Sequence, residues 1–106
     1  MPLFTYGAKL LRVVDGDTVR LDLDLGFYQW RHDQSYRLLR INAPEMNTVE
    51  GGAAKIALEG FLTDKKLVAH TEKSDHFGRF LVDLSANEES VSDWLVAHGF
   101  AAFKTY

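Results

Sequence analysis

The sequence predicts a β-rich α+β fold built on a small barrel, and three observations support this prediction. Short apolar segments are separated by turn signals, of which Asp15-Gly16 is the clearest. The segment after that turn alternates strictly between apolar and polar residues, as a half-buried strand does. Two later segments instead carry apolar residues at helical spacing. Five short strands, one helix between the third and fourth, and a second helix near the C-terminus form the layout of an OB-type barrel.

The first two strands are expected at residues 9–14 and 18–25, joined by a tight hairpin turn at Asp15-Gly16. The second strand places its apolar side chains on one face, and these are Val19, Leu21, Leu23 and Leu25. Because side chains alternate across a strand, that face is expected to be buried and the opposite face exposed.

The aromatic-rich segment 26–33 is interpreted as either a loop or an extension of a strand. The third strand is expected at 34–41. Pro44 then ends it, because proline has no amide hydrogen for a strand ladder and the chain must turn.

An amphipathic helix is expected at about 53–64, opened by Gly51-Gly52. The fourth strand, the turn after it and the fifth strand are expected at 66–73, 75–78 and 80–84. Ser90 and Asp93 have the spacing of a helix N-cap with an acidic partner, and Gly99 is a typical helix end. The second helix is therefore expected between these residues.

The chain of 106 residues is expected to form one domain, 1–106, with a core that needs no disulfides. It has no cysteine, which excludes disulfides and thiolate zinc sites. No signal peptide or membrane-spanning segment is visible, so we expect a cytoplasmic monomer with no membrane partner, although a secreted mature form would look the same. The net charge of −3 argues weakly against a nucleic-acid binder, but a site for a divalent cation needs local carboxylates.

Asp15 and Asp17 are the first candidate metal-site residues. Calcium and magnesium prefer oxygen ligands, and acidic residues in turns supply them. We expect Asp17 to bind the metal directly. Asp15 is expected to lie next to this site and support it without being a metal ligand itself. Taken alone, however, an Asp-Gly dipeptide is more often a simple hairpin turn.

Asn42 and Glu45 lie where the third strand ends and the chain turns, so both side chains are expected to be exposed. Glu45 has the chemistry to hold or deprotonate an attacking water, but a solvated turn would have the same composition.

Arg37 lies among apolar neighbours and must find a partner, because a buried unpaired cation is costly. A salt bridge to a carboxylate would give Arg37 that partner. Arg79, taken alone, is more simply interpreted as an exposed charge on a hairpin. Both guanidinium groups are also suited to binding phosphate.

The chain resembles the staphylococcal nuclease family from about Val13 to Phe103. Four motifs in this order carry the resemblance: Val14-Asp15-Gly16-Asp17-Thr18-Val19, Tyr36-Arg37-Leu38-Leu39 leading to Ala43-Pro44-Glu45, Asp75-His76-Phe77-Gly78-Arg79, and Trp94-Leu95-Val96-Ala97-His98-Gly99-Phe100-Ala101. The resemblance implies a five-stranded OB barrel and calcium-dependent cleavage of DNA and RNA. It also implies 5′-hydroxyl and 3′-phosphate ends.

By position, the resemblance implies roles for individual residues. It implies that Arg37, Glu45 and Arg79 are catalytic. The implied calcium ligands are Asp17, Asn42 and the backbone carbonyl of Ala43, with Asp15 nearby. The implied substrate contacts are Leu38, His76, Phe77, Leu81 and Tyr106.

Three departures from the family pattern bear on function. Asn42 replaces an aspartate, which removes one negative charge from the metal site and should weaken calcium binding. His76 and Phe77 replace a lysine and a tyrosine that hold a substrate phosphate. The segment 46–52 is shorter than the family's flexible loop often is. The family's usual third helix and the tyrosines that pack on a base are missing or reduced to Tyr106. We expect an active nuclease, because decayed members lose the arginines and the glutamate. The alternative is an inactive module that binds nucleic acid or protein.

Overall fold

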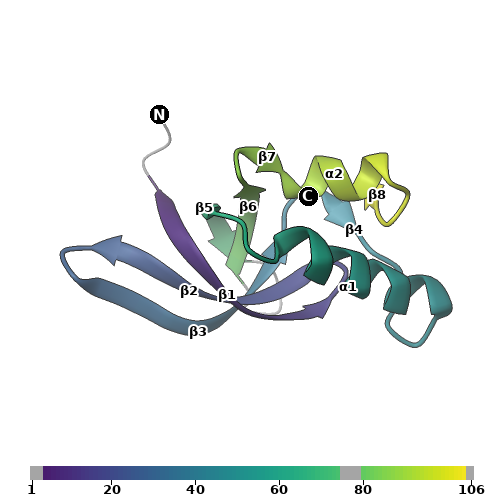
Figure 1. Ribbon diagram of the computed structural model, residues 1–106, viewed down its shortest axis with the longest axis horizontal. Helices are drawn as coiled ribbons and strands as arrows, with labels where there is room; N and C mark the ends of the chain where they lie inside the picture. Colours follow the sequence, from purple (N-terminus) through teal and green to yellow (C-terminus); the bar gives the residue numbers. More distant parts are fainter. Residues whose placement is uncertain (1–3, 75–79, 105–106) are drawn as a thin grey trace.

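The computed structural model describes residues 4–74 and 80–104, and they form a closed five-stranded barrel with two helices (Figure 1). The hydrogen-bonded order of the barrel strands is β3-β2-β1-β5-β6, and a parallel pairing of β3 with β6 closes the barrel. The barrel strands are β1 (Thr5–Asp15), β2 (Thr18–Gly26), β3 (Gln29–Leu38), β5 (Leu67–Ser74) and β6 (Phe80–Ala86). The remaining elements are β4 (Ile41–Asn42), α1 (Val49–Leu62), β7 (Glu89–Ser90), α2 (Val91–Ala97) and β8 (Ala102–Phe103). The predicted OB-type barrel, with a helix between its third and fourth strands, is confirmed.

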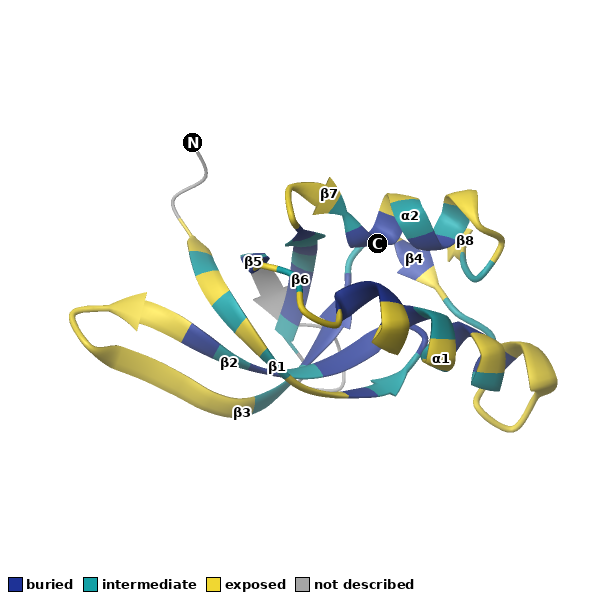
Figure 2. Ribbon diagram, viewed as in Figure 1, coloured by how far each residue is buried: buried dark blue, intermediate teal, exposed yellow. Residues whose placement is uncertain are grey.

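The core fills the barrel and the space beneath α1, as the dark ribbon segments in Figure 2 show. The alternation in β2 is confirmed for Val19, Leu21 and Leu23, whose side chains are buried. It is wrong for Leu25, which is 42% exposed. The reason is that β2 and β3 continue past the barrel as a long hairpin, drawn in yellow in Figure 2, and Leu25 lies on that extension.

The third strand begins earlier and ends earlier than predicted. It starts at Gln29, so segment 26–33 is mostly strand, and it ends at Leu38 rather than at residue 41. Arg40 has φ of 69°, a left-handed conformation that interrupts the ladder. Ile41–Asn42 then forms the separate strand β4, which pairs with β8. Asn42 therefore belongs to a second, two-stranded sheet rather than to a barrel strand.

Helix α1 starts at Val49, one turn earlier than predicted, because Thr48 is its N-cap. The Thr48 side chain accepts a hydrogen bond from the amide of Gly51 at 3.0 Å. The N-cap at Ser90 is confirmed, since its side chain accepts from the amide of Asp93. No helix within residues 4–74 and 80–104 is long and apolar enough to cross a membrane.

Candidate functional site

One cavity of about 260 Å³ collects most of the residues that the sequence singles out. Four segments meet there: the β1–β2 turn, the end of β3, the end of β4 and the turn that leads into α1. The cavity is lined by Asp15, Asp17, Arg37, Asn42, Ala43, Pro44, Glu45 and Met46. Residues up to 31 positions apart in the sequence thus line one polar cavity.

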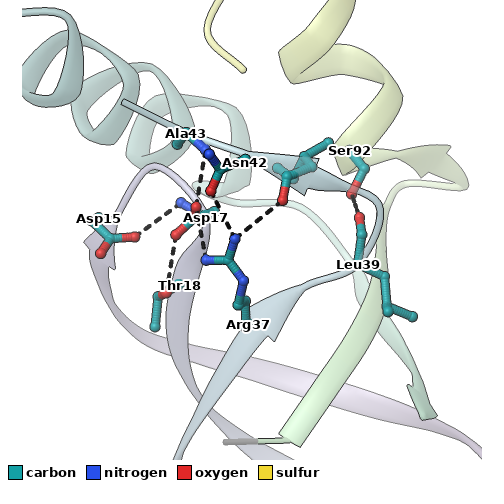
Figure 3. A network of polar contacts seen from close by, with 9 residues as sticks. Asp15, Asp17, Thr18, Arg37, Leu39, Asn42, Ala43 and Ser92 are labelled. Carbon is teal, nitrogen blue, oxygen red and sulfur yellow. Dashed lines mark hydrogen bonds and ion pairs between the residues drawn. The ribbon is translucent and has the colours of Figure 1, made fainter. Parts of the chain in front are cut away.

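A buried ion pair joins the two sides of this cavity. The Arg37 Nη1 atom lies 2.9 Å from Asp17 Oδ2, and both residues are less than a tenth exposed (Figure 3). The need of Arg37 for a partner, read from its apolar neighbours, is therefore met by Asp17. Because two charges this deep each lose hydration, neither is stable there without the other.

The Asp17 carboxylate accepts two further hydrogen bonds. The amide of Ala43 donates to Oδ2 at 2.9 Å, and the Thr18 hydroxyl donates to Oδ1 at 3.2 Å. Burial raises the pKa of Asp17, but a hydrogen bond with Asp15, the Ala43 amide and the Arg37 charge together outweigh burial and lower it. Asp17 is therefore ionised at neutral pH. Burial and the neighbouring Asp17 raise the pKa of Asp15, so Asp15 is the first of the two to take up a proton.

Arg37 also contacts the end of β4. Its Nη2 atom donates to the Asn42 side-chain oxygen at 3.0 Å and to the Ile41 carbonyl at 3.4 Å. The guanidinium group thus bridges Asp17 and Asn42, the two side chains expected to bind a metal (Figure 3).

Glu45 is exposed, and its backbone is held firmly at the start of α1. Its carbonyl accepts from the Thr48 amide at 3.1 Å and from the Thr48 hydroxyl at 2.6 Å. Glycine at position 51 makes this turn possible, because a Cβ atom there would lie 1.9 Å from the Glu45 carbonyl oxygen. The N-terminus of α1 therefore fixes the backbone from which the Glu45 carboxylate extends.

Gly16 allows the turn between β1 and β2 to pack closely against its neighbours. A Cβ atom at Gly16 would lie 2.7 Å from the Cβ of Ala43 and 2.8 Å from the Cβ of Ala54 on α1. The Asp15-Gly16 turn is confirmed, but Gly16 also has a packing role that the turn signal does not reveal. It brings Asp15 and Asp17 close to Ala43.

The predicted substrate contacts at Leu38 and Leu81 are corrected. Their side chains are 0% and 2% exposed, respectively, so they form part of the barrel interior and offer no surface to a substrate. The other predicted contacts, together with one predicted catalytic residue, lie outside the described residues, and these are His76, Phe77, Tyr106 and Arg79.

Four residues that hold the site were missed in the sequence. The Thr18 hydroxyl donates to Asp17, and Thr48 is the N-cap of α1. Gly51 leaves room for the Glu45 carbonyl, and the Ser92 hydroxyl donates to the Leu39 carbonyl at 2.8 Å. Only Thr48 has a local signal, since it stands immediately before a helix at a position where threonine is a favoured N-cap. Thr18 and Gly51 act on residues close to them in the sequence but only in the folded turns, whereas Ser92 acts across the fold.

The side-chain oxygen atoms around the cavity are of the type that calcium prefers, since they come from three carboxylates, those of Asp15, Asp17 and Glu45, and from the amide of Asn42. Across residues 4–74 and 80–104, no three His, Cys, Asp or Glu side chains gather as a metal-binding group. A cation here would therefore depend partly on the neutral oxygen atoms of Asn42 and Ala43.

Comparison with known proteins gives two findings. A family model described as staphylococcal nuclease homologue matches residues 35–106, more than half of the chain. Protein ParB of Escherichia coli is 29% identical over 84 residues, which are 79% of this chain and 44% of that protein. The chain thus spans less than half the length of this relative.

Proposed function

Because the chain belongs to the staphylococcal nuclease homologue family, we propose that its polar cavity hydrolyses phosphodiester bonds of DNA or RNA with calcium. One observation carries this proposal: the Asp17 carboxylate and the Arg37 guanidinium meet in the cavity that Glu45 also lines. In the proposed reaction, water attacks phosphorus in line with the leaving oxygen. The products are a 5′-hydroxyl and a 3′-phosphate.

The all-oxygen donor set fits calcium. The groups that would hold it are the side chains of Asp17 and Asn42 and the Ala43 carbonyl. Asp15 would lie near the ion without binding it directly. When bound, calcium polarises a phosphoryl oxygen and stabilises the charge that develops on it. Arg37 donates a hydrogen bond to the Asn42 side-chain oxygen and forms an ion pair with Asp17. Release of Arg37 from these two residues would free its guanidinium group to bind the phosphate.

Glu45 is proposed to position the attacking water and accept its proton. Its carboxylate is exposed and extends from a backbone that the α1 cap holds in place. General base catalysis contributes about 10²–10⁴-fold to a rate. Arg37, together with Arg79, is proposed to stabilise the phosphorane-like transition state, as planar guanidinium groups suit phosphate oxygens.

The proposal is tested by calcium titration of plasmid DNA cleavage. We expect cleavage to rise with calcium, to stop on addition of EDTA and to return when calcium is added in excess. A matched control is the Arg12→Gln variant, because Arg12 is exposed and does not line this cavity. We expect wild type and this control to cleave equally. Equal cleavage would show that loss of one positive charge away from the cavity does not itself change the cleavage rate.

One observation favours a second function. Asn42 stands where the family has an aspartate, so the site lacks that carboxylate, and the Asn42 side chain contacts Arg37. In that alternative the barrel binds nucleic acid or protein without cutting it. Absence of cleavage at millimolar calcium, with oligonucleotide binding retained, would support this binding module and contradict the enzyme.

The Asn42→Asp variant is expected to bind calcium roughly tenfold to thirtyfold more tightly. An added unit charge about 4 Å from a divalent ion contributes about 2 kcal/mol even at the dielectric constant of water. The measurement is the calcium concentration that gives half-maximal cleavage, supported by calorimetric titration of the free protein. An unchanged midpoint would remove Asn42 from the proposed ligand set.

A further inference from the structure

Residues 38–41 form a turn that joins two residues of the polar cavity, and we call it the 38–41 turn. Arg37 lies just before it, near the end of β3, and Asn42 lies just after it, at the end of β4. The Arg37 Nη2 atom closes the turn by donating to the Ile41 carbonyl at 3.4 Å and to the Asn42 side-chain oxygen at 3.0 Å. The conformation of the 38–41 turn therefore sets where Asn42 lies relative to Arg37.

Backbone hydrogen bonds tie the 38–41 turn to the elements around it. These bonds join Leu38 to Asp17 at 2.8 Å, Leu39 to Val82 at 2.8 Å and Arg40 to Lys104 at 2.7 Å. Arg40 has a left-handed backbone, with φ of 69°, which is unfavourable for a residue with a side chain. Such a conformation persists where the surrounding structure holds it, so the bonds to the turn maintain its shape.

A further bond to the 38–41 turn comes from a side chain on α2. The Ser92 hydroxyl donates to the Leu39 carbonyl at 2.8 Å (Figure 3). Ser92 is 0% exposed, and Val91 and Leu95 on the same helix are buried as well. A buried hydroxyl is unfavourable unless it is hydrogen-bonded, and serine favours a helix less than alanine does. The bond to Leu39 offsets both effects, and an alanine at this position would not supply it.

Ser92 does not line the polar cavity, but the carbonyl it holds lies between two residues that do. Leu39 comes two residues after Arg37 and three residues before Asn42. We propose that Ser92 is a positioning residue of the polar cavity, because its bond to Leu39 sets the turn that brings Arg37 and the Asn42 oxygen together. This inference rests on the proposed function, since it gives α2 a part in calcium binding.

The physical basis of this proposal is preorganisation of a ligand. A ligand that is already held in its bound conformation loses little freedom when the ion arrives, so binding is tighter. Without the Ser92 hydroxyl, the Leu39 carbonyl loses a partner and the 38–41 turn can take up other arrangements. Calcium must then order the turn as it binds Asn42. The loss of one net hydrogen bond corresponds to about threefold to tenfold in affinity.

The first measurement uses the Ser92→Ala variant in EDTA, without DNA. In ¹⁵N-labelled protein, NMR reports the side-chain amide of Asn42 and the Nε–H group of Arg37. Both signals are expected to shift relative to wild type, because the contact between these two side chains depends on the turn. Since neither calcium nor substrate is present, this result does not depend on whether the polar cavity cleaves DNA.

The second measurement is calorimetric titration of calcium into the free proteins. Ser92→Ala is expected to bind calcium about threefold to tenfold more weakly than wild type. Its thermal midpoint is also expected to fall by about 5–15 °C, because a buried carbonyl loses a partner. Ser92→Cys retains a weak donor in a side chain of similar shape, so its effects are expected to lie between those of wild type and Ser92→Ala. It also provides the test if Ser92→Ala does not fold.

The matched control is Leu67→Val, which removes one methylene group from the core. Leu67 is 4% exposed, lies on β5 and does not line the polar cavity. Its loss of packing is expected to lower the thermal midpoint as well. The calcium affinity and the Asn42 and Arg37 signals of this variant are expected to match wild type, because its 38–41 turn is intact.

Two results would overturn the proposal. One is a Ser92→Ala protein that melts earlier but keeps the wild-type calcium affinity and the wild-type Asn42 and Arg37 signals, which would make Ser92 a purely structural residue. The other is an equal change in Leu67→Val, which would assign the effect to general destabilisation. Shifted signals in Ser92→Ala, together with a wild type that neither binds calcium nor cleaves DNA, would contradict the proposed function and support the positioning role of Ser92.

Discussion

Replacing Arg37 with methionine is expected to lower the free energy of unfolding by about 3–5 kcal/mol, because it leaves a buried carboxylate without its cation. Asp17 is 6% exposed, and Arg37 is its ion-pair partner at 2.9 Å. The Ala43 amide and the Thr18 hydroxyl remain as donors, but neither carries a charge. Urea denaturation of wild type and variant measures the difference.

The double variant Asp17→Asn with Arg37→Met is expected to recover much of that loss, because no unpaired charge then stays buried. Arg40→Met is the matched control. Arg40 is about half exposed and lies 3.5 Å from Asp83 and 3.3 Å from Asp93, so its loss is expected to cost less than about 1 kcal/mol. Equal losses for Arg37→Met and Arg40→Met would mean that the buried pair does not stabilise the barrel.

The barrel itself could be predicted from local patterns. Strict alternation from Val19 to Leu23 encodes a strand with one buried face, and Asp15-Gly16 encodes the turn before it. The Ser90 cap was likewise visible, because a cap bonds to an amide only three residues away. Interactions between close neighbours in sequence leave a signature that a single chain can show.

The parts that were missed depend on contacts between distant residues. The break between Leu38 and Ile41 arises because Leu38 bonds to the Asp17 carbonyl and Leu39 to the Val82 carbonyl, after which Arg40 turns the chain. The partners of these residues are 21 and 43 positions away, respectively, and local propensity cannot identify them. The burial of Leu38, which removes it from the predicted substrate contacts, likewise follows from closure of the barrel.

The site was predicted as a set of residues, but its electrostatics were not. Motifs indicated that Asp17, Arg37 and Asn42 act together. The apolar neighbours of Arg37 indicated a salt bridge, but they did not indicate that Arg37 would contact the Asp17 and Asn42 oxygen atoms assigned to calcium. The same three residues therefore serve both folding and the proposed chemistry. Substitutions among them will change stability and calcium affinity together, whereas a residue with an exposed side chain can test catalysis alone.

Glu45 offers that separate test, and Glu45→Gln is expected to lower the cleavage rate about 10²–10⁴-fold at saturating calcium. The amide keeps the shape of the side chain but cannot accept a proton from water at neutral pH. Stability is expected to stay unchanged, because the side chain is exposed and the turn is held through the Glu45 backbone carbonyl. Single-turnover cleavage of a labelled DNA strand measures the rate.

The matched control for this prediction is Glu50→Gln, which removes an exposed carboxylate from the first turn of α1, five residues further on. It changes the net charge by the same amount but lies outside the cavity lining, so its cleavage rate is expected to match wild type. Oligonucleotide affinity measured in EDTA should be equal in all three proteins. If Glu45→Gln cut DNA within about threefold of the wild-type rate, the effect would be far below the range for a general base, and another group would have to activate the water.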